Sequence, residues 1–486
     1  MRRCGVRQAL SKKGGKLMIM SVINTISGFL WGWPLITLLI VGGIYFSVRT
    51  KFVQVGMFKE AWRVILEKPE NEGDISSFGA LMVSTASRVG TGNIIGVSTA
   101  ICLGGPGALF WMWVVALLGG ASGFVESCLA QIYKKKNPDG SSYGGPAYYI
   151  EAALHSRPLA IIFSVCLIAC YGIAFNMLAA YNMQDTFKYY SFYDPAVFPK
   201  VFGAALGLLC LYCLIGGGRR IVAICERLVP VMGVFYVLVA IVVIALNIGN
   251  IPHMLGMIFA DAFDFKAIFS GLMGSCMILG FKRGLFSNEA GIGSAPNAAA
   301  SASTSHPAKQ GLVQMMSVFI DTLLLCSCTG FMCLCSGVDP TKELSGAPYV
   351  QASLKAVFGE IGPTFMVVAL AMFAFSTLLG NFFFIENCFT YLNGKPLSKS
   401  ALNTIRTVGA VIIGIGATLS AGTVWDLADF LNVIMAFINM PVCMLIGGTA
   451  YKCLNDYREK RKTSDKIHFH AKDIGLDPST LDFWNE

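Results

Sequence analysis

Residues 280–291 read GFKRGLFSNEAG and directly follow the apolar run of residues 268–279. A lysine, an arginine and a glutamate therefore stand among glycines in a segment that is otherwise suited to a membrane. Placing a charge in a bilayer is costly, so charged residues at this depth usually belong to a site or a cavity. The neighbouring glycines predict a helix that unwinds inside the membrane, where protein or a water-filled cavity must satisfy the freed backbone.

A second glycine-rich interruption lies early in the chain, at Gly90-Thr91-Gly92-Asn93. It also falls inside a long apolar segment. Interrupted membrane segments at corresponding places in two halves of a chain are typical of secondary transporters, which bind their solute between the breaks. The pair of breaks therefore predicts a central site for a small solute and its ions.

The composition indicates a membrane protein. Of the 486 residues 55% are hydrophobic, only 13% are charged, and the mean hydropathy is +0.63, whereas soluble domains carry about 25% charged residues. The net charge of +9 does not indicate a nucleic-acid partner, because the basic residues lie in short loops and at the termini. The 16 cysteines fall mostly in apolar runs and are expected to be small buried residues. H-E-x-x-H does not occur, and we expect neither an enzyme nor a cofactor.

Hydropathy predicts an all-α polytopic membrane protein with about eleven transmembrane helices of about 20 residues each. The approximate limits are residues 28–47, 79–103, 106–132, 160–183, 201–216, 220–247, 268–293, 312–336, 362–390, 401–420 and 427–451. The first helix stands alone, and the other spans form two groups of five, each with a break in its first member. An odd number of spans per group inverts the second repeat relative to the first. The expected parts are an N-terminal extension (1–27), an extra helix (28–47), two five-helix repeats (79–247 and 268–451) and a tail (452–486).

Basic residues predict the orientation of these helices. Lysines and arginines gather in the loops after the first, third and fifth spans and in the tail. The positive-inside rule therefore places the C-terminus in the cytoplasm and the N-terminus outside. The charged tail is expected to be soluble and partly disordered. The basic residues among 1–17 oppose this orientation, so we expect Met18 or Met20 to start the working protein.

Five stretches carry a resemblance to a known family. They are GTGNIIGVSTAICLGGPGALFWMW (90–113), GGPAYYIE (144–151), RGLFSNEAGIGSAP (283–296), HPAKQGLVQ (306–314) and FIDT (319–322). Together they resemble the alanine or glycine:cation symporters, which are sodium:alanine symporters of the amino acid–polyamine–cation group. The resemblance implies a leucine-transporter-like inverted repeat after one extra helix, in a bacterial inner membrane. It also implies the import of a small neutral amino acid driven by sodium.

The chemistry of the first break suits an amino acid. Backbone N–H groups are exposed at the start of a half-helix, where the helix dipole favours a carboxylate. Glycine permits the close approach that a side chain would block. Together with the resemblance, this predicts as substrate-binding residues Gly90, Thr91, Gly92, Asn93, Ala179, Met277, Gly280 and Asn381.

Ser376 and Thr377 form a hydroxyl pair in the ninth predicted span. The resemblance implies that they face the carbonyls of Ala86 and Val89 across a sodium site, because a hard cation prefers oxygen ligands. The alternative is that both hydroxyls bond to carbonyls of their own helix. Asn93 is a candidate for a second ion site or for bracing the break.

Three further residues are expected to act at the second break as gating or structural groups: Arg283, Asn288 and Glu289. Arg283 and Glu289 are expected to cap or pair there and to gate the cytoplasmic side. Glu126, Asp321 and Glu386 also lie in or near spans, where structural pairing inside the bundle is more expected than contact with a substrate.

The chain departs from the family pattern at two pocket positions. Ala179 stands where the family has a glutamine, and Asn381 stands where it has a tryptophan. The lost bulk predicts a larger side-chain pocket than alanine needs, with Asn381 favouring a polar substrate such as glutamine, serine or threonine. A proton-coupled transporter and a transport-deficient amino acid sensor remain as alternatives. A channel would be expected to show repeated pore loops, which do not occur.

Overall fold

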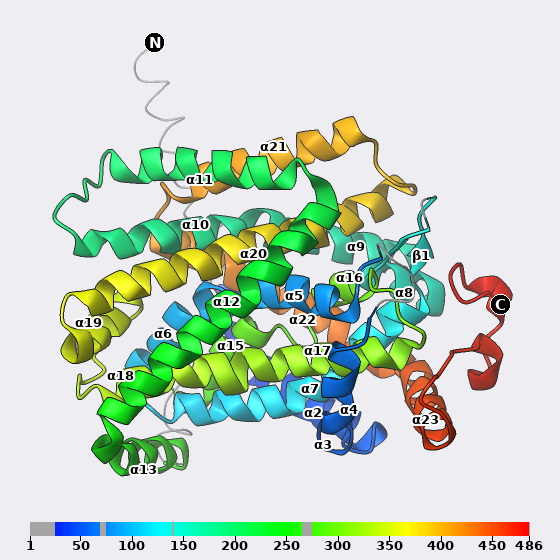
Figure 1. The fold of residues 1–486 in the computed structure, drawn as a ribbon, viewed down its shortest axis with the longest axis horizontal. Helices are drawn as coiled ribbons and strands as arrows, with labels where there is room; N and C mark the ends of the chain where they lie inside the picture. Colours follow the sequence, from blue (N-terminus) through cyan, green and yellow to red (C-terminus); the bar gives the residue numbers. More distant parts are fainter. Residues whose placement is uncertain (1–24, 69–73, 139, 265–274, 486) are drawn as a thin grey trace.

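The computed structural model of the chain describes residues 25–68, 74–138, 140–264 and 275–485 (Figure 1). These residues form helices almost throughout. Their single sheet is a small antiparallel hairpin of β1 (Lys135–Lys136) and β2 (Ser142–Tyr143). The predicted all-α class is therefore confirmed. Most of the predicted N-terminal extension, residues 1–24, lies outside the described residues.

The helices of the first half follow in chain order. They are α2 (Trp33–Arg49), α3 (Val53–Gly56), α4 (Phe58–Ile65), α5 (Ser77–Arg88), the π-helical η1 (Gly92–Gly96), α6 (Val97–Gly104), α7 (Ala108–Ile132), α8 (Pro146–Leu154), α9 (Arg157–Leu167), the π-helical η2 (Ile168–Ala174), α10 (Phe175–Asp185), the 3₁₀-helix η3 (Thr186–Tyr189), α11 (Phe198–Leu214) and α12 (Gly217–Leu246).

The second half continues in the same way. It contains η4 (Ile248–Asn250), α13 (Ile251–Ala262), α15 (Cys276–Asn288), α16 (Pro296–Ala299), α17 (Pro307–Phe319), the π-helical η5 (Ile320–Cys326), α18 (Ser327–Cys335), η6 (Lys342–Leu344), α19 (Ala347–Phe358), α20 (Ile361–Asn393), α21 (Lys399–Gly416), α22 (Ala421–Ile446), α23 (Gly448–Thr463), η7 (Ala471–Ile474) and η8 (Pro478–Thr480).

The long helices match the predicted spans. Among the described residues six helical segments are long and apolar enough to cross a membrane, and shorter apolar helices include α2 and α11. Each predicted span overlaps a helix or a broken pair of helices, while the full number of crossings remains a prediction. Large apolar side chains on α11 and α12, such as Leu208 and Val231, are exposed, as expected for surfaces that face lipid tails.

The helices run roughly parallel in one bundle (Figure 1). Helix α7 packs against α17 and α15, and α11 packs against α21. The short helices α13 and α19 lie at one end of the bundle, which we call the α13 end. The hairpin, α8, α16 and α23 lie at the opposite end, which we call the tail end (Figure 1).

Both predicted breaks are present, but the second occupies only the last part of the predicted stretch. Helix α5 stops at Arg88, and the backbone resumes as η1 at Gly92. Helix α15 continues without interruption through Gly280 and ends only at Asn288. The chain then takes positive φ angles of 53° at Glu289, 86° at Gly291 and 91° at Gly293, before α16 begins.

Gly280 is a packing residue and does not break the helix. A Cβ on Gly280 would collide with the backbone of Ala108 and the side chain of Trp111. Gly280 therefore lets α15 pack closely against α7 and does not unwind the helix. The unwinding occurs instead where Gly291 and Gly293 adopt conformations that other residues rarely take.

The C-terminal tail is packed against the bundle, so its predicted partial disorder was wrong for residues up to 485. Ile467, Phe469 and Leu481 are buried. The Phe469 amide donates to the Ser305 carbonyl at 2.9 Å, and the Trp484 indole donates to the Gln131 carbonyl at 2.8 Å. These apolar residues bury enough surface to order a segment whose charge suggests otherwise.

Candidate binding site at the two helix breaks

The first break is held by a side chain from its own segment. The Gly90 amide donates to the Asn93 side-chain oxygen at 2.9 Å, which ties the start of the break to the next helix. The side-chain nitrogen of Asn93, Nδ2, donates in turn to Asp321 Oδ1 at 2.7 Å. The structure thus places Asn93 as a brace of the break, one of its two predicted roles. A role in binding a second ion remains a prediction.

The predicted hydroxyl pair lies against the first broken helix. Thr377 Oγ1 lies 3.2 Å and Ser376 Oγ 3.4 Å from the Ala86 carbonyl oxygen. Both hydroxyls also bond to the Phe373 carbonyl of their own helix, at 3.0 and 2.8 Å. The two interpretations of the pair therefore hold together, because back-bonding fixes the hydroxyls while they face Ala86. Val89, which follows α5 directly with a non-helical ψ of 85°, stays a predicted ligand only.

A small cavity lies beside this pair. Four of the predicted substrate-binding residues line it, namely Gly90, Thr91, Gly92 and Ala179. Thr377 lines it as well, so the candidate cation site and the cavity share a wall. The walls that sequence reasoning missed are Ser87, Arg88, Phe175, Leu178 and Phe286, and Glu289 closes the cavity from the second break.

Four predicted substrate contacts do not line this cavity, and one of them is Asn93, which braces the first break. Met277 and Gly280 lie on α15 two to three turns before the break, at packing positions. Phe286 and Glu289 reach the cavity in their place because the helix unwinds only after Asn288. Asn381 is fully buried next to the cavity, and its amide already bonds to Ser87 and Asn176.

The helix ends around the cavity carry complementary partial charges. Helix η1–α6 begins at Gly92 with its N-terminus toward the cavity, which favours an anion. Helices α5 and α15 end there with their C-termini, which favour a cation. One anion-preferring end and two cation-preferring ends suit a zwitterion accompanied by a cation.

A buried carboxylate joins the two breaks. Asp321, in η5, accepts hydrogen bonds from Asn93 at 2.7 Å, from Ser287 at 2.7 Å and from Thr322 at 2.8 Å. Asn93 belongs to the first broken helix and Ser287 to the second, so Asp321 holds both ends in one position. Sequence reasoning assigned Asp321 to structural pairing, and these bonds are of that kind.

Arg88 is the functional residue that sequence reasoning missed most clearly. It lies at the end of α5, is 2% exposed, and interacts electrostatically with the carboxylates of Glu126, Glu289 and Asp321. Its Nε and Nη2 atoms have no hydrogen-bond partner among the described residues. An arginine in an otherwise apolar span is itself a signal for a site, so the sequence did contain it.

A layer of aromatic and charged side chains closes the cavity toward the α13 end. The guanidinium carbon of Arg283 lies 4.5 Å from the centre of the Trp425 ring. The ring centres of Trp425 and Phe286 are 5.2 Å apart. Asp429 on α22 pairs with Arg283 at 3.4 Å and with Lys282 at 2.6 Å. The expected gate at Arg283 therefore lies at the end opposite to the tail. Its predicted position on the tail side was wrong, because α15 precedes the break and runs toward it from the α13 end.

The second break is fixed by polar contacts of its own. Glu126 on α7 accepts from the Gly291 amide at 3.2 Å and from Asn439 at 2.9 Å. Asn439 also donates to the Gly291 carbonyl at 2.9 Å. Glu289 accepts from Ser294 at 2.6 Å. The Asn288 side chain accepts from the Ala290 amide at 3.1 Å and so stabilises the turn that follows α15.

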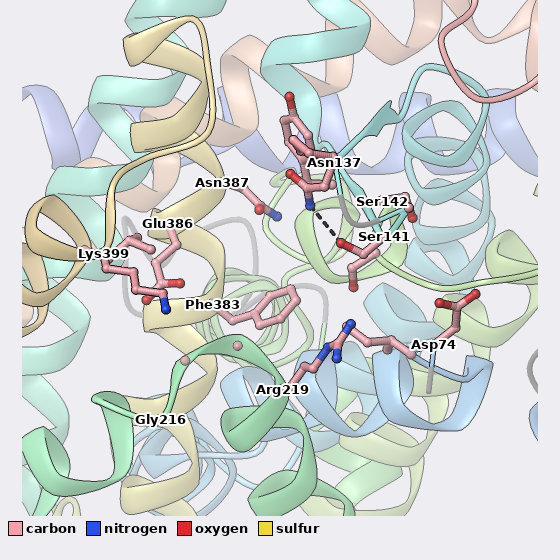
Figure 2. Close-up of a pocket in the computed structure, with 18 of the residues that line it drawn as sticks. Asp74, Asn137, Ser141, Ser142, Gly216, Arg219, Phe383, Glu386, Asn387 and Lys399 are labelled. Atoms are coloured by element: carbon pink, nitrogen blue, oxygen red, sulfur yellow. Dashed lines mark hydrogen bonds between the residues drawn. The ribbon is translucent and has the colours of Figure 1, made fainter. Parts of the chain in front are cut away.

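A much larger cavity of about 740 Å³ opens at the tail end. Figure 2 shows Phe383 and Glu386 of α20, Arg219 of α12 and Asp74 among the residues around it. The hairpin residues Asn137 and Ser141 lie across from α20 in the same view, joined by a hydrogen bond of 2.9 Å (Figure 2). We call this cavity the vestibule.

Comparisons with known proteins identify relatives of the whole chain. A model of the sodium:alanine symporter family matches residues 16–471. The amino-acid carrier protein AlsT of Bacillus subtilis is 41% identical, with 93% of this chain and 95% of the relative covered. The probable sodium/glutamine symporter GlnT of the same organism is 39% identical, with 95% of each chain covered. The solved structure of MhsT in complex with L-phenylalanine superposes with a TM-score of 0.52 at 15% identity, covering 86% of this chain and 94% of that one, which supports the predicted transporter fold.

Proposed function

The chain belongs to the sodium:alanine symporter family, and we propose that it carries a small neutral amino acid across the membrane together with sodium. In this proposal the cavity between the breaks holds the amino acid, and the Arg283–Trp425 layer and the vestibule lie on its two sides. The bundle alternates between states that open the cavity to one side or the other.

The position of the hydroxyl pair is the observation that carries this proposal. Thr377 belongs both to the cavity wall and to the oxygen cluster with Ser376 and the Ala86 carbonyl. These are hard oxygen donors of the kind that suit a hard cation. A sodium ion there would lie next to the bound amino acid, so each would favour binding of the other.

The first break offers the groups that recognise an amino acid backbone. We assign the carboxylate to the N-terminus of η1 around Gly90 and Gly92, where a side chain would fill the cavity. The ammonium is assigned to the C-terminal ends of α5 and α15. Size selection then falls to the side-chain walls, of which Ala179 is the one that departs from the family pattern.

We propose a substrate larger than alanine, such as glutamine, serine or threonine. The small Ala179 side chain lies on the cavity wall with Phe175 and Leu178. The relative GlnT is named a probable sodium/glutamine symporter, which agrees with a wider pocket within this family. The predicted polar contact at Asn381 would require its bonds to Ser87 and Asn176 to rearrange.

We propose that the tail end faces the cytoplasm of a bacterial cell and that the α13 end faces outward. The support is the excess of lysine and arginine in the loops of the tail end. With this orientation the structure has its outer side closed by the Arg283 layer, and the vestibule opens inward.

A proton is the second candidate for the coupled ion, because Asp321 supplies a buried carboxylate next to the break. Its bonds to Asn93 and Ser287 would change if the carboxylate took up a proton. Proton coupling predicts transport that follows a pH gradient in the absence of sodium.

Uptake into proteoliposomes tests the proposal. Purified protein is reconstituted, and uptake of labelled alanine, glycine, serine, threonine and glutamine is measured with an inward sodium gradient, with a proton gradient and with neither. We expect concentrative uptake with sodium alone. Uptake driven by the pH gradient alone would favour the Asp321 alternative, and equal uptake in all three conditions would contradict coupling.

A further inference from the structure

A chain of three hydrogen-bonded side chains lies on the tail side of the cavity. Ser87 Oγ donates to Asn381 Oδ1 at 2.6 Å, and Asn381 Nδ2 donates to Asn176 Oδ1 at 2.9 Å. All three residues are buried, with Asn381 and Asn176 fully excluded from the surface. They come from three different helices, α5, α20 and α10. We call this group the bracket.

The bracket separates the cavity from the vestibule. Along α20, Thr377 lines the cavity, Asn381 follows about one turn later, and Phe383 and Glu386 line the vestibule. Along α10, Asn176 lies about one turn closer to the tail end than Ala179. Ser87 lines the cavity itself. The three side chains thus lie between the residues that line the vestibule and the rest of the cavity wall.

The backbones of α20 and α5 also approach each other closely at this level. A Cβ on Gly380 would lie 2.8 Å from the Ser87 amide nitrogen and 3.0 Å from the Val83 carbonyl oxygen. The glycine next to Asn381 therefore allows α20 and α5 to touch at the level of the bracket. Neutral hydrogen bonds hold this contact, and each contributes little net free energy. Breaking the contact therefore costs less free energy than separating an apolar interface of similar size.

We infer that the bracket is the inner gate, which must open to release the amino acid into the vestibule. This inference rests on the proposed transport function and assigns Asn381 a positioning role: it holds α5 and α10 together and does not need to touch the substrate. The layer around Arg283 closes the opposite side with charges and aromatic rings. The two barriers therefore differ in chemistry, and each can be weakened separately.

Solvent access to the cavity tests the inference. A reporter cysteine replaces Ala179, and its labelling by a membrane-impermeant maleimide is measured in vesicles of both orientations, with the parent chain giving the background from native cysteines. Protease removal of a C-terminal tag identifies which vesicles expose the tail end. Adding Ser87→Ala removes one bond of the bracket and should raise labelling from the tail side about two- to tenfold, as expected for one neutral hydrogen bond.

Two further variants make the result specific. Ser98→Ala is the matched control, because Ser98 Oγ is buried and donates to the Gly346 carbonyl at 2.6 Å toward the α13 end; it should leave tail-side labelling unchanged. Asn176→Ala should raise labelling as Ser87→Ala does, and the double variant should show less than the product of the two effects, because both act through Asn381.

Wild-type labelling rates in both Ser87→Ala and Asn176→Ala would overturn the inference. Equal increases from both sides of the membrane would also overturn it, because they would indicate loosened packing. The assay requires no substrate or sodium. A result against the bracket as a gate is therefore distinguishable from a result against the proposed transport function.

Discussion

The two breaks are built differently although they face the same cavity. The first break has no side chains at Gly90 and Gly92, and neither glycine has a positive φ angle. These glycines therefore allow other groups to come close to the backbone. The second carries positive φ angles at Glu289, Gly291 and Gly293, so its glycines serve the path of the chain. Glu126 and Asn439 hold that path in place.

The difference teaches that similar glycine-rich sequences can have separate tasks. At the first break, space beside the backbone is needed, because an added Cβ on Gly90 would overlap the Thr377 hydroxyl and one on Gly92 would lie 3.2 Å from the Phe286 ring. At the second break, backbone conformation and buried polar contacts are needed. We therefore expect changes at the first break to alter ligand binding and changes at the second to alter stability.

The largest effect is expected from Gly92→Leu. The new side chain would occupy the cavity against Phe286 and remove the place of the carboxylate. Binding of labelled amino acid to the purified variant should fall below detection while the protein still inserts. Gly233→Leu on α12 is the control, because a Cβ there meets nothing within 4 Å. Normal uptake by a well-expressed Gly92→Leu protein would refute the carboxylate assignment.

The pocket wall should decide substrate preference. The double change Ala179→Gln with Asn381→Trp refills the two positions at which the chain departs from the family pattern. It should shift preference toward alanine and glycine by about 10- to 100-fold in competition assays. Single variants separate the positions, and we expect most of the shift from Ala179→Gln because Ala179 lines the cavity. A wild type that already prefers alanine, with no shift in the double variant, would contradict the wider pocket.

The second break should respond in stability. Asn439→Ala leaves Glu126 and the Gly291 carbonyl without this partner, which costs about 1–3 kcal/mol. Thermal unfolding in detergent should occur at a lower temperature, while amino acid affinity at low temperature stays close to that of wild type. Asn393→Ala, which removes an exposed bond to the Lys395 carbonyl, is the control. Unchanged stability together with lost binding would reverse the roles of the two breaks.

The smallest effect concerns the tail, which packs beside the second broken segment. Burial disfavours the charge on His306, but its contacts with Cys453 and Asp456 raise its pKa above the ordinary value. A raised pKa stabilises the packed tail below the ordinary value of about 6.5, and this contribution is lost as the pH rises through the raised pKa. Hydrogen exchange of residues 467–474, corrected for intrinsic rates, should therefore quicken between pH 6 and pH 8. The His306→Gln protein should lack this dependence, and an equal dependence there would exclude His306 as the cause.

The sequence was sufficient for the parts that follow from hydropathy and local chemistry. Apolar runs located the spans, and the hydroxyls of Ser376 and Thr377 lie against Ala86 as the resemblance implied. The second break was predicted to begin too early because Gly280 looks like a helix breaker, whereas only its contact with α7 shows that it is a packing residue. The tail was misjudged because its net charge hides the apolar residues that order it, such as Phe469.

Tertiary contacts explain what local patterns did not show. Asn381 was expected in the pocket because it stands where the family pattern has a tryptophan. Its bonds reach residues 294 and 205 positions away in the chain, and no local pattern contains them. Arg88 was visible as a charge in an apolar span, but its proximity to three carboxylates depends on how α5, α7 and η5 pack together.

The sodium dependence of amino acid binding to purified protein tests the central claim most directly. Binding of the preferred substrate is titrated with sodium at constant ionic strength, in the wild type, in Thr377→Val and in Thr390→Val. Thr390 is the matched control on α20, since its hydroxyl bonds to the Glu386 carbonyl one turn back. We predict that sodium promotes binding and that Thr377→Val alone raises the required sodium concentration about tenfold, near 1.4 kcal/mol. Binding that is the same in potassium as in sodium, or a Thr377→Val titration that coincides with the wild type, would contradict a cation site at the first break.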